Sequence, residues 1–254
     1  MRRICLTVGL ACALMLAGCG GSRPPESAAA PSAPAIPDEA NGATITGKVA
    51  FDGNQPVPKT IDMSANPACS RAHASAPART DDAVVNDNGT LRYAFVWIKA
   101  GLPPGATWQV PSTAVHLDQK GCMYQPHVIG AMAGQTIAIG NSDPTNHNIH
   151  PQPQTNQEWN EIQAPGGADK IESFPRQEVM IPVKCNIHPW MRSYIGVVSH
   201  PFFAVTGDDG TYAIKGLPPG TYTLEVWHEK YGTLDRQITV GAKDTRTQDF
   251  TLKG

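Results

Sequence analysis

The sequence predicts an all-β protein. The chain has 254 residues, and its 24 glycines and 23 prolines favour many turns over long helices. Short segments in which apolar and polar residues alternate recur between these turn residues, as they do in half-buried strands. Many short strands separated by Gly and Pro turns are typical of β-sandwiches, so we expect the chain to consist mainly of sandwiches.

The chain begins with the features of an export signal. Arg2 and Arg3 precede an apolar run over residues 4–16, and the sequence Leu-Ala-Gly-Cys ends at Cys19. A basic start, a short apolar run and a small-residue cleavage site are typical of secretory signals, and the run is too short to span a bilayer. The motif Leu-Ala-Gly-Cys at residues 16–19 resembles the bacterial lipobox. This resemblance implies that residues 1–18 are removed and that Cys19 is acylated. An ordinary signal peptide with an incidental cysteine is the alternative.

The lipobox resemblance implies a lipid-anchored protein of the bacterial cell envelope that faces the periplasm. Gly20 rather than an aspartate follows Cys19, which resembles lipoproteins of the outer membrane. Residues 19–42 contain almost no large apolar side chain, so we expect them to form a disordered tether. The formal net charge of −2 provides neither a footprint for nucleic acid nor a polybasic patch for a membrane.

Order is expected to begin at Ala43. Residues 43–51 alternate as strands do, and Asp52-Gly53 is a turn signal after them. Residues 92–98 are predicted to form another strand. Residues 62–90 lie between them, are polar and predict no defined element. We group residues 43–114 as an N-terminal β segment.

Residues 115–203 are predicted to form a separate sandwich. Strands are expected at residues 115–118, 127–129, 135–139, 179–183 and 195–198, separated by Gly, Asn, Asp and Pro turns. The polar stretch 151–173 is longer than most loops, which indicates a functional or mobile segment.

The most informative motif lies at residues 184–191. Cys185, His188 and Met191 have the spacing Cys-x2-His-x2-Met, and an upstream segment from His147 to His150 supplies further imidazoles. Two histidines, one cysteine and one methionine are the ligands of a mononuclear blue-copper electron-transfer site. Thiolate and thioether favour Cu(I), whereas imidazole accepts either oxidation state.

Both motifs resemble those of the small blue copper proteins, the cupredoxins. The loop that starts at Cys185 is closest to that of amicyanin, and the segment that starts at His147 resembles the upstream histidine segment of the family. The resemblance runs from about residue 115 to residue 198 and implies a Greek-key sandwich. It implies the metal ligands His147, Cys185, His188 and Met191, with the backbone of Asn148 hydrogen-bonding the copper thiolate.

Each candidate ligand has an alternative. His147 and His150 are three apart and face opposite sides of an extended strand, so only one can face the metal; the resemblance favours His147 and leaves His150 as a polar rim residue. Met191 can instead be a core residue. Zinc also accepts Cys and His ligands, but it does not explain the methionine. In cupredoxins the second ligand histidine reaches the surface where partners dock, which implies that Pro189 and Trp190 line such a patch.

Three cysteines remain once residues 1–18 are removed and Cys19 is acylated. An odd number in an exported protein indicates one free or metal-bound thiol. With Cys185 as a metal ligand, Cys69 and Cys122 are a candidate disulfide in an oxidising compartment. Two buried thiols, or an additional metal ligand, are the alternatives.

Residues 204–254 have a pattern of their own. A turn at residues 208–210, a strand at 211–214, a Gly-Leu-Pro-Pro-Gly turn and an alternating strand at 221–228 follow one another. This part resembles the carboxypeptidase regulatory-like domain, a small transthyretin-related sandwich. Residues 43–60 resemble the opening strand and turn of that family. One possible architecture therefore joins residues 43–60 to residues 204–254 in a single sandwich, with the copper domain inserted between them.

The sequence thus predicts a membrane-anchored carrier of single electrons with one copper ion that alternates between Cu(I) and Cu(II). Redox proteins, which the sequence does not identify, are the expected partners. Enzymatic turnover is not expected, because four protein ligands leave no open coordination position for a substrate. Two alternatives remain: a copper storage or delivery protein, and a structural or ligand-binding lipoprotein whose metal site is vacant.

Overall fold

The structure is a computed structural model that describes residues 35–254. The predicted signal segment, Cys19 and most of the predicted tether lie outside this range. The backbone of Ala35 exchanges two hydrogen bonds of 2.8 Å with Thr107 and Gln109, so the chain is hydrogen-bonded before Ala43, where we expected order to begin. In the described range, no helix has the length and apolar character needed to cross a membrane.

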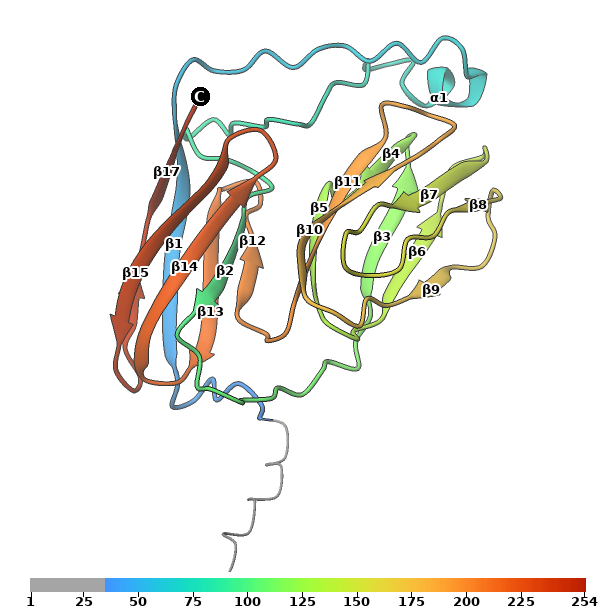
Figure 1. The fold of residues 1–254 in the computed structure, drawn as a ribbon. Helices are drawn as coiled ribbons and strands as arrows, with labels where there is room; N and C mark the ends of the chain where they lie inside the picture. The colour runs from blue at the N-terminus through green and yellow to red at the C-terminus, as the bar shows by residue number, and fades with distance from the viewer. Residues whose placement is uncertain (1–34) are drawn as a thin grey trace, which may run out of the picture. The chain divides into compact units, whose positions relative to one another are not determined.

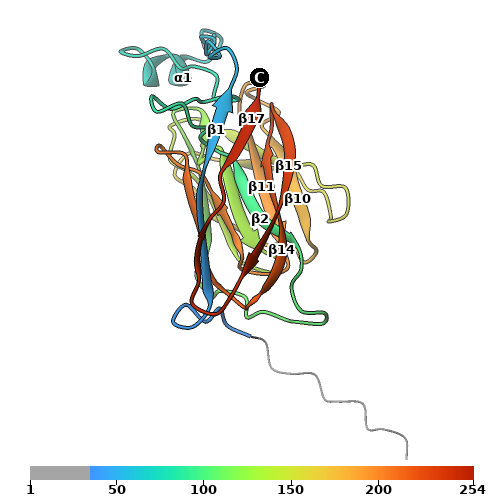
Figure 2. The same cartoon turned by 90° about the vertical axis from the view of Figure 1, so that its left-hand side faces the viewer.

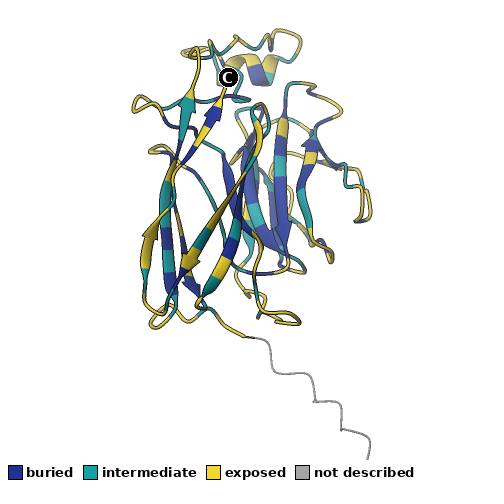
Figure 3. Cartoon of the chain, turned by 60° about the vertical axis from the view of Figure 1, so that its left-hand side comes forward, coloured by how far each residue is buried: buried dark blue, intermediate teal, exposed yellow. Residues whose placement is uncertain are grey.

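The described chain is built almost entirely from strands, which confirms the predicted all-β fold class (Figure 1). Within residues 35–254 the one α-helix is α1, Pro67–Ala72. The strands form four sheets, which pair into two sandwiches with separate apolar cores. Figure 3 shows how the buried positions gather along the strands while the connecting turns are exposed.

The C-terminal sandwich combines the last strands of the chain with β1 and β2. One sheet has the order β13-β1-β16, with β17 also paired to β1, and the other has the order β12-β2-β14-β15. Their bounds are β1 Ala43–Asp52, β2 Phe95–Ala100, β12 Phe203–Val205, β13 Thr211–Leu217, β14 Gly220–His228, β15 Gly232–Val240, β16 Thr245–Thr247 and β17 Phe250–Lys253. Ile45, Val96 and Leu224 are among the fully buried side chains of the shared core.

Strand β1 joins the C-terminal strands directly. It is antiparallel to β13 and parallel to β16 and β17, and Figure 2 shows β1 and β17 side by side. The predicted N-terminal β segment is divided between the two sheets, because β2 pairs with β14 in the opposite sheet. Alternation identifies the buried face of a strand but not its neighbour, so the sequence did not show that β2 belongs to this sandwich.

The central sandwich contains the segment with the Cys-x2-His-x2-Met motif. Its sheets have the orders β5-β11-β10-β7-β8 and β4-β3-β6-β9. The bounds are β3 Val115–Lys120, β4 Met123–Gln125, β5 Val128–Met132, β6 Ile137–Asn141, β7 His147–Pro151, β8 Glu161–Gln163, β9 Lys170–Glu172, β10 Glu178–Lys184 and β11 Arg192–Val198. The five predicted strands correspond to β3, β5, β6, β10 and β11.

The stretch 151–173 differs from the long loop that we expected. It contains two short edge strands, β8 paired with β7 and β9 paired with β6. Each has a large apolar residue that faces solvent, Ile162 and Ile171. Backbone pairing, rather than burial of side chains, therefore holds this stretch in place, and a hydrophobicity pattern does not reveal it.

Helix α1 lies in the segment between β1 and β2, where the sequence predicted no element. Asn66 caps it, since its Oδ1 accepts hydrogen bonds from the backbone N–H groups of Ala68 at 3.0 Å and Cys69 at 3.2 Å. The predicted disulfide is present and joins the buried Cys69 to Cys122 of the central sandwich. A helix of six residues is not stable by itself, so contacts with the sandwich must hold it.

A buried ion cluster links three parts of the chain. His127 of the central sandwich is 2% exposed, and its Nε2 is hydrogen-bonded to Glu229, which follows β14. Its Nδ1 lies 3.1 Å from Oδ2 of Asp81, without the alignment of a hydrogen bond. Burial alone would lower the pKa of His127, but the two carboxylates outweigh it and raise the pKa to about 9.

The free energy of unfolding should therefore fall as the pH rises from neutral to alkaline. The pKa of His127 is higher in the folded chain than its unfolded value of about 6.5, so its contribution is complete below that pH and is lost as the pH passes about 9. We expect a loss on the order of 3 kcal/mol, measured by chemical denaturation across this range. Glu229→Gln should reduce the slope. Equal slopes in the two proteins would contradict the assignment.

Candidate metal centre

A short hairpin loop positions the cysteine and one histidine. Strands β10 and β11 are antiparallel, with Lys184 opposite Arg192, and the loop between them contains Cys185, His188 and Met191. Within the loop, the N–H of Met191 donates to the carbonyl of His188 at 2.9 Å, and the N–H of His188 donates to Sγ of Cys185 at 3.3 Å. These bonds turn the His188 side chain toward the sulfur.

The neighbouring strand β7 supplies His147, the other candidate ligand histidine. It pairs with β10, with His150 opposite Lys184, which places His147 and Asn148 beside the loop. The N–H of Asn148 donates to Sγ of Cys185 at 3.4 Å, and its Oδ1 accepts from the N–H of Asn186 at 3.0 Å. Asn148 thus ties the two ligand segments together.

Tyr124 is a further link between the two ligand-bearing strands. Its fully buried hydroxyl lies within hydrogen-bond distance of the carbonyl of Asn148 on β7, at 2.5 Å, and of the carbonyl of Lys184 on β10, at 3.1 Å. Tyr124 thereby fixes the spacing of the strands that hold the site.

The structure brings His147, Cys185 and His188 together in a buried group. Their ligand atoms all lie within 4.8 Å of one another. Nδ1 of His147 lies 2.9 Å from Nδ1 of His188, which in turn lies 3.8 Å from Sγ of Cys185. Bonds of about 2.0 Å to nitrogen and 2.3 Å to sulfur around one tetrahedral ion would give separations of about 3.3 and 3.5 Å. The three donors therefore fit one metal ion with small adjustments.

Asp143 orients the first of these imidazoles. Its Oδ2 lies 2.8 Å from Nε2 of His147, and its carboxylate also accepts from the N–H groups of Gly121 and Cys122, both at 2.7 Å. Burial alone would raise the pKa of Asp143, but these hydrogen bonds lower it. Burial alone would lower the pKa of His147, but Asp143 and Cys185 raise it, so a metal ion at Nδ1 must displace a proton. Asp143, which accepts from Nε2–H, directs Nδ1 toward that ion.

The pKa shifts of the other two donors favour metal-binding protonation states. Burial alone would raise the pKa of Cys185, but hydrogen bonds from His147 and from backbone N–H groups lower it, which favours the thiolate. Burial and the neighbouring charge of His147 lower the pKa of His188, which favours neutral imidazole. Thiolate and neutral imidazole are the forms that coordinate metal ions.

The remaining candidate residues lie around this group. Met191 is fully buried in the same apolar core as Cys185. His150 lies at the rim, where Nε2 is 2.6 Å from Oε1 of Glu158 and Nδ1 is 3.2 Å from Oδ1 of Asn186. It therefore has polar partners away from the three donors, in agreement with its predicted place.

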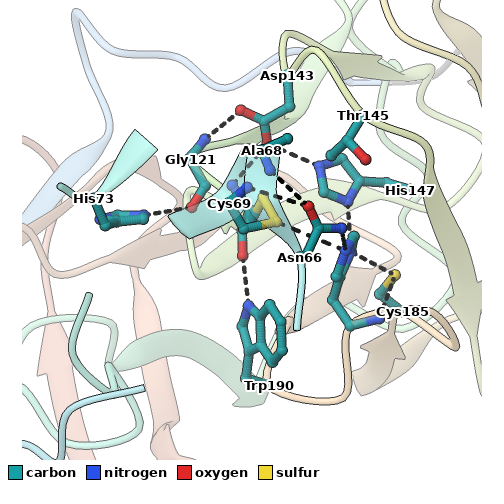
Figure 4. Close-up of a disulfide and its surroundings, with 12 residues drawn as sticks. Asn66, Ala68, Cys69, His73, Gly121, Asp143, Thr145, His147, Cys185 and Trp190 are labelled. Atoms are coloured by element: carbon teal, nitrogen blue, oxygen red, sulfur yellow. Dashed lines mark hydrogen bonds and ion pairs between the residues drawn. A yellow bond between two sulfur atoms is a disulfide. The ribbon is translucent and has the colours of Figure 1, made fainter. Parts of the chain in front are cut away.

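The expectation that His188 reaches the surface is wrong. Its side chain is only 2% exposed, because the segment with α1 covers it. Nδ2 of Asn66 lies 2.7 Å from Nε2 of His188, and Sγ of Cys69 lies 3.7 Å from the same atom. Figure 4 shows Asn66 and Cys69 on one side of the site and Cys185 on the other. The cupredoxin resemblance covers residues 115–198, so it did not include this cover.

Trp190 lies between the buried His188 and a surface hollow. Its ring centroid is 5.1 Å from that of His188, and its Nε1–H donates to the carbonyl of Cys122 at 2.9 Å. Trp190 also lines a cavity of about 440 Å³, together with His127, Arg192 and other residues. Pro189, the other predicted patch residue, is exposed.

Sequence reasoning missed two residues that act on the site, Asp143 and Asn66. Asp143 lies four residues before His147, and a carboxylate so close to a candidate ligand histidine was a usable signal. Asn66 lies 122 residues before His188, in a segment with no strand or ligand pattern. Only the disulfide prediction, which connects Cys69 to Cys122, pointed to that segment.

One family model matches part of the chain. The carboxypeptidase regulatory-like domain matches residues 197–253, which include strands β12 to β17 of the C-terminal sandwich. This finding confirms the predicted resemblance of the C-terminal part. The match covers less than half of the chain and leaves out the three metal-binding candidates. No curated protein matches the chain at a significant level.

Solved structures with similarity to this chain include three copper proteins. A copper-containing nitrite reductase from Thermus scotoductus SA-01 is 20% identical with a TM-score of 0.31, covering 39% of this chain and 25% of that chain. A purple cupredoxin from Nitrosopumilus maritimus is 18% identical, with a TM-score of 0.29 and coverage of 33% and 98%. Amicyanin from Paracoccus versutus is 20% identical, with a TM-score of 0.30 and coverage of 40% and 96%.

The chain thus spans about a quarter of the nitrite reductase chain and nearly all of the two smaller proteins. TM-scores near 0.3 are too low to support a conclusion about fold or activity. What this chain binds must therefore be argued from its own donor atoms.

Proposed function

We propose that this protein is an exported, membrane-anchored carrier of single electrons, with one copper ion held by His147, Cys185 and His188 and with Met191 as a weak axial ligand. The observation that carries the proposal is the convergence of one thiol and two imidazoles within 4.8 Å in a buried site. This donor set, with a nearby methionine, is typical of blue-copper electron-transfer sites.

The residues around the sulfur support a redox role. A copper ion held there would supply one-electron chemistry between Cu(I) and Cu(II). The N–H groups of Asn148 and His188 both donate to Sγ of Cys185, at 3.4 and 3.3 Å, so the thiolate charge is stabilised by fixed backbone donors. Asn148 and His188 both lie in segments that are fixed by hydrogen bonds. Their N–H groups should therefore stay in place when the copper ion changes its oxidation state.

Electrons would enter and leave through Trp190 rather than through an exposed His188. The Trp190 ring contacts the His188 ring on one side and lines the surface hollow on the other. Redox partner proteins would therefore dock at that hollow. A lipid at Cys19 would keep the protein at the envelope membrane, facing the periplasm, and substrate turnover is not part of the proposal.

Copper storage or delivery would use the same three donors, and kinetics separate the two functions. A carrier should show a reversible one-electron wave in voltammetry and release Cu(I) to a chelator over hours. A delivery protein should give up Cu(I) within seconds to minutes. Burial of all three donors under the α1 segment favours slow release. Rapid, complete transfer of Cu(I) to bicinchoninate from the Cu(I)-loaded protein, with its disulfide intact, would overturn the carrier assignment.

Met191→Gln should change the potential of the site without loss of copper. A weak axial ligand contributes little binding energy and mainly tunes the potential. We therefore expect a shift in the midpoint potential measured by voltammetry, with one copper still bound per chain. Met180→Gln, at a buried position outside the ligand loop, is the matched control and should leave the potential unchanged. Equal potentials for wild type and Met191→Gln would contradict the axial role.

A further inference from the structure

The Cys69–Cys122 disulfide lies directly against the candidate metal centre. Sγ of Cys69 is 3.7 Å from Nε2 of His188. Sγ of Cys122 forms a second group with Asp143 and His147, whose ligand atoms all lie within 4.8 Å of one another. All five residues are buried, and Figure 4 shows Cys69 beside Asp143 and His147. Two sulfurs therefore lie next to imidazoles that already belong to a metal site.

We propose that reduction of this disulfide creates a second site for Cu(I), in which Cys69 and Cys122 are the thiolate ligands and Nε2 of His188 is the third donor. Two soft thiolates and one imidazole suit Cu(I), and the same donors also suit Zn²⁺. The separation of 3.7 Å between Sγ of Cys69 and Nε2 of His188 is close to the value of about 3.5 Å for a sulfur and a nitrogen bound to one ion.

The chemistry balances with a dithiol as reductant. The dithiol gives up two electrons and two protons and becomes a disulfide, while the Cys69–Cys122 bond breaks and leaves two thiols. Binding of Cu(I) then displaces the two thiol protons. When the Cys185 site is also occupied, it displaces the ring proton of His188 as well, so that the imidazolate bridges the two ions. The site exists only in the reduced protein, because a disulfide sulfur has no thiolate charge to offer.

The local structure allows the change. In the oxidised protein Asn66 occupies the space at Nε2 of His188, at 2.7 Å, and must withdraw before an ion binds there. Asn66 is the cap of the six-residue helix α1, which the disulfide ties to the central sandwich. Once that bond opens, a hydrogen bond of 2.6 Å from His73 to the carbonyl of Gly121 remains, as does the packing of Met63 and Ala78 in the central core. Trp190 still holds the backbone of Cys122.

The inference deepens the proposed function and rests on it only in that His188 serves both sites. His188 faces the Cys185 site with Nδ1 and the disulfide with Nε2. A Cu(I) ion at the thiolates would thus be separated from the buried centre only by the imidazole ring of His188. Thiol reduction would then couple the electron carrier to the uptake or release of copper.

Anaerobic Cu(I) titration against bicinchoninate tests the proposal. The reference protein, called wild type in this experiment, and both variants carry serine at Cys5, Cys12 and Cys19. Only Cys69, Cys122 and Cys185 can then bind Cu(I) as thiolates. Each is titrated as the disulfide form and again after reduction by a phosphine and desalting. Wild type should bind about one Cu(I) when oxidised and about two when reduced. Cys69→Ser with Cys122→Ser should bind about one in both conditions, and Cys185→Ser should bind none when oxidised and about one when reduced.

The second site is supported if reduction increases the number of Cu(I) ions bound per chain and if this increase requires Cys69 and Cys122. The same stoichiometry for oxidised and reduced wild type overturns it, and this comparison uses one sequence, so it holds even if the double serine variant does not fold. Failure of the proposed function has a different signature: oxidised wild type would then bind no Cu(I), whatever happens on reduction.

Discussion

Replacing Cys69 and Cys122 together by serine is expected to lower the free energy of unfolding by about 4 kcal/mol. The two residues are 53 apart in sequence, and a cross-link that closes a loop of this length removes much conformational freedom from the unfolded chain. Chemical denaturation of the oxidised proteins measures the difference. The effect should be large because the disulfide ties the buried Cys69 of α1 to the central sandwich.

The matched control for the disulfide variant is Cys185→Ser in the metal-free protein. It also removes a buried sulfur, but Cys185 is a free cysteine and forms no cross-link. We expect Cys185→Ser to lower the free energy of unfolding clearly less than the double variant does. Similar losses for the two variants would mean that the disulfide contributes only through packing, and the account of α1 as a cross-linked cover would be wrong.

Asp143→Asn is expected to weaken copper binding by about 10- to 100-fold. Asp143 accepts hydrogen bonds from Nε2 of His147 and from two backbone N–H groups, at 2.8, 2.7 and 2.7 Å. The asparagine has the same shape, but it lacks the negative charge and offers only one accepting oxygen to three donors. The imidazole of His147 would then lose both its orientation and its added basicity. Competition titration with a chelator of known affinity measures the loss.

Asp118→Asn is the control for this prediction. Asp118 also accepts from a backbone N–H and a side chain, those of Ser142, but it lies on the surface outside the three-donor group. Its substitution should leave copper affinity unchanged. If Asp143→Asn bound copper as tightly as Asp118→Asn does, the orienting role of Asp143 would be refuted.

The sequence contained the candidate ligands but not their surroundings. Cys185 and His188 lie in one short loop, so their spacing alone predicted that they act together. His147 was placed by its resemblance to an upstream motif, and the pairing of β7 with β10 brings it to the loop. Local spacing and residue type determine such a motif, which is why it could be read without coordinates.

The cover over His188 could not be predicted in the same way. Asn66 and Cys69 come from a polar segment with no periodicity, and they reach His188 through a short helix and a disulfide. The place of β2 was missed for a related reason, because its apolar run predicts a strand and not the identity of β14 as its neighbour. Long-range pairing of this kind depends on the whole fold.

The visible spectrum of the protein loaded with Cu(II) tests the central claim that His147, Cys185 and His188 hold one copper ion. We expect an intense thiolate-to-copper charge-transfer band at one Cu(II) per chain, absent in Cys185→Ser and retained in His150→Gln, which alters only a rim histidine. A protein that binds Cu(II) without this band, or a band that survives in Cys185→Ser, would contradict the account.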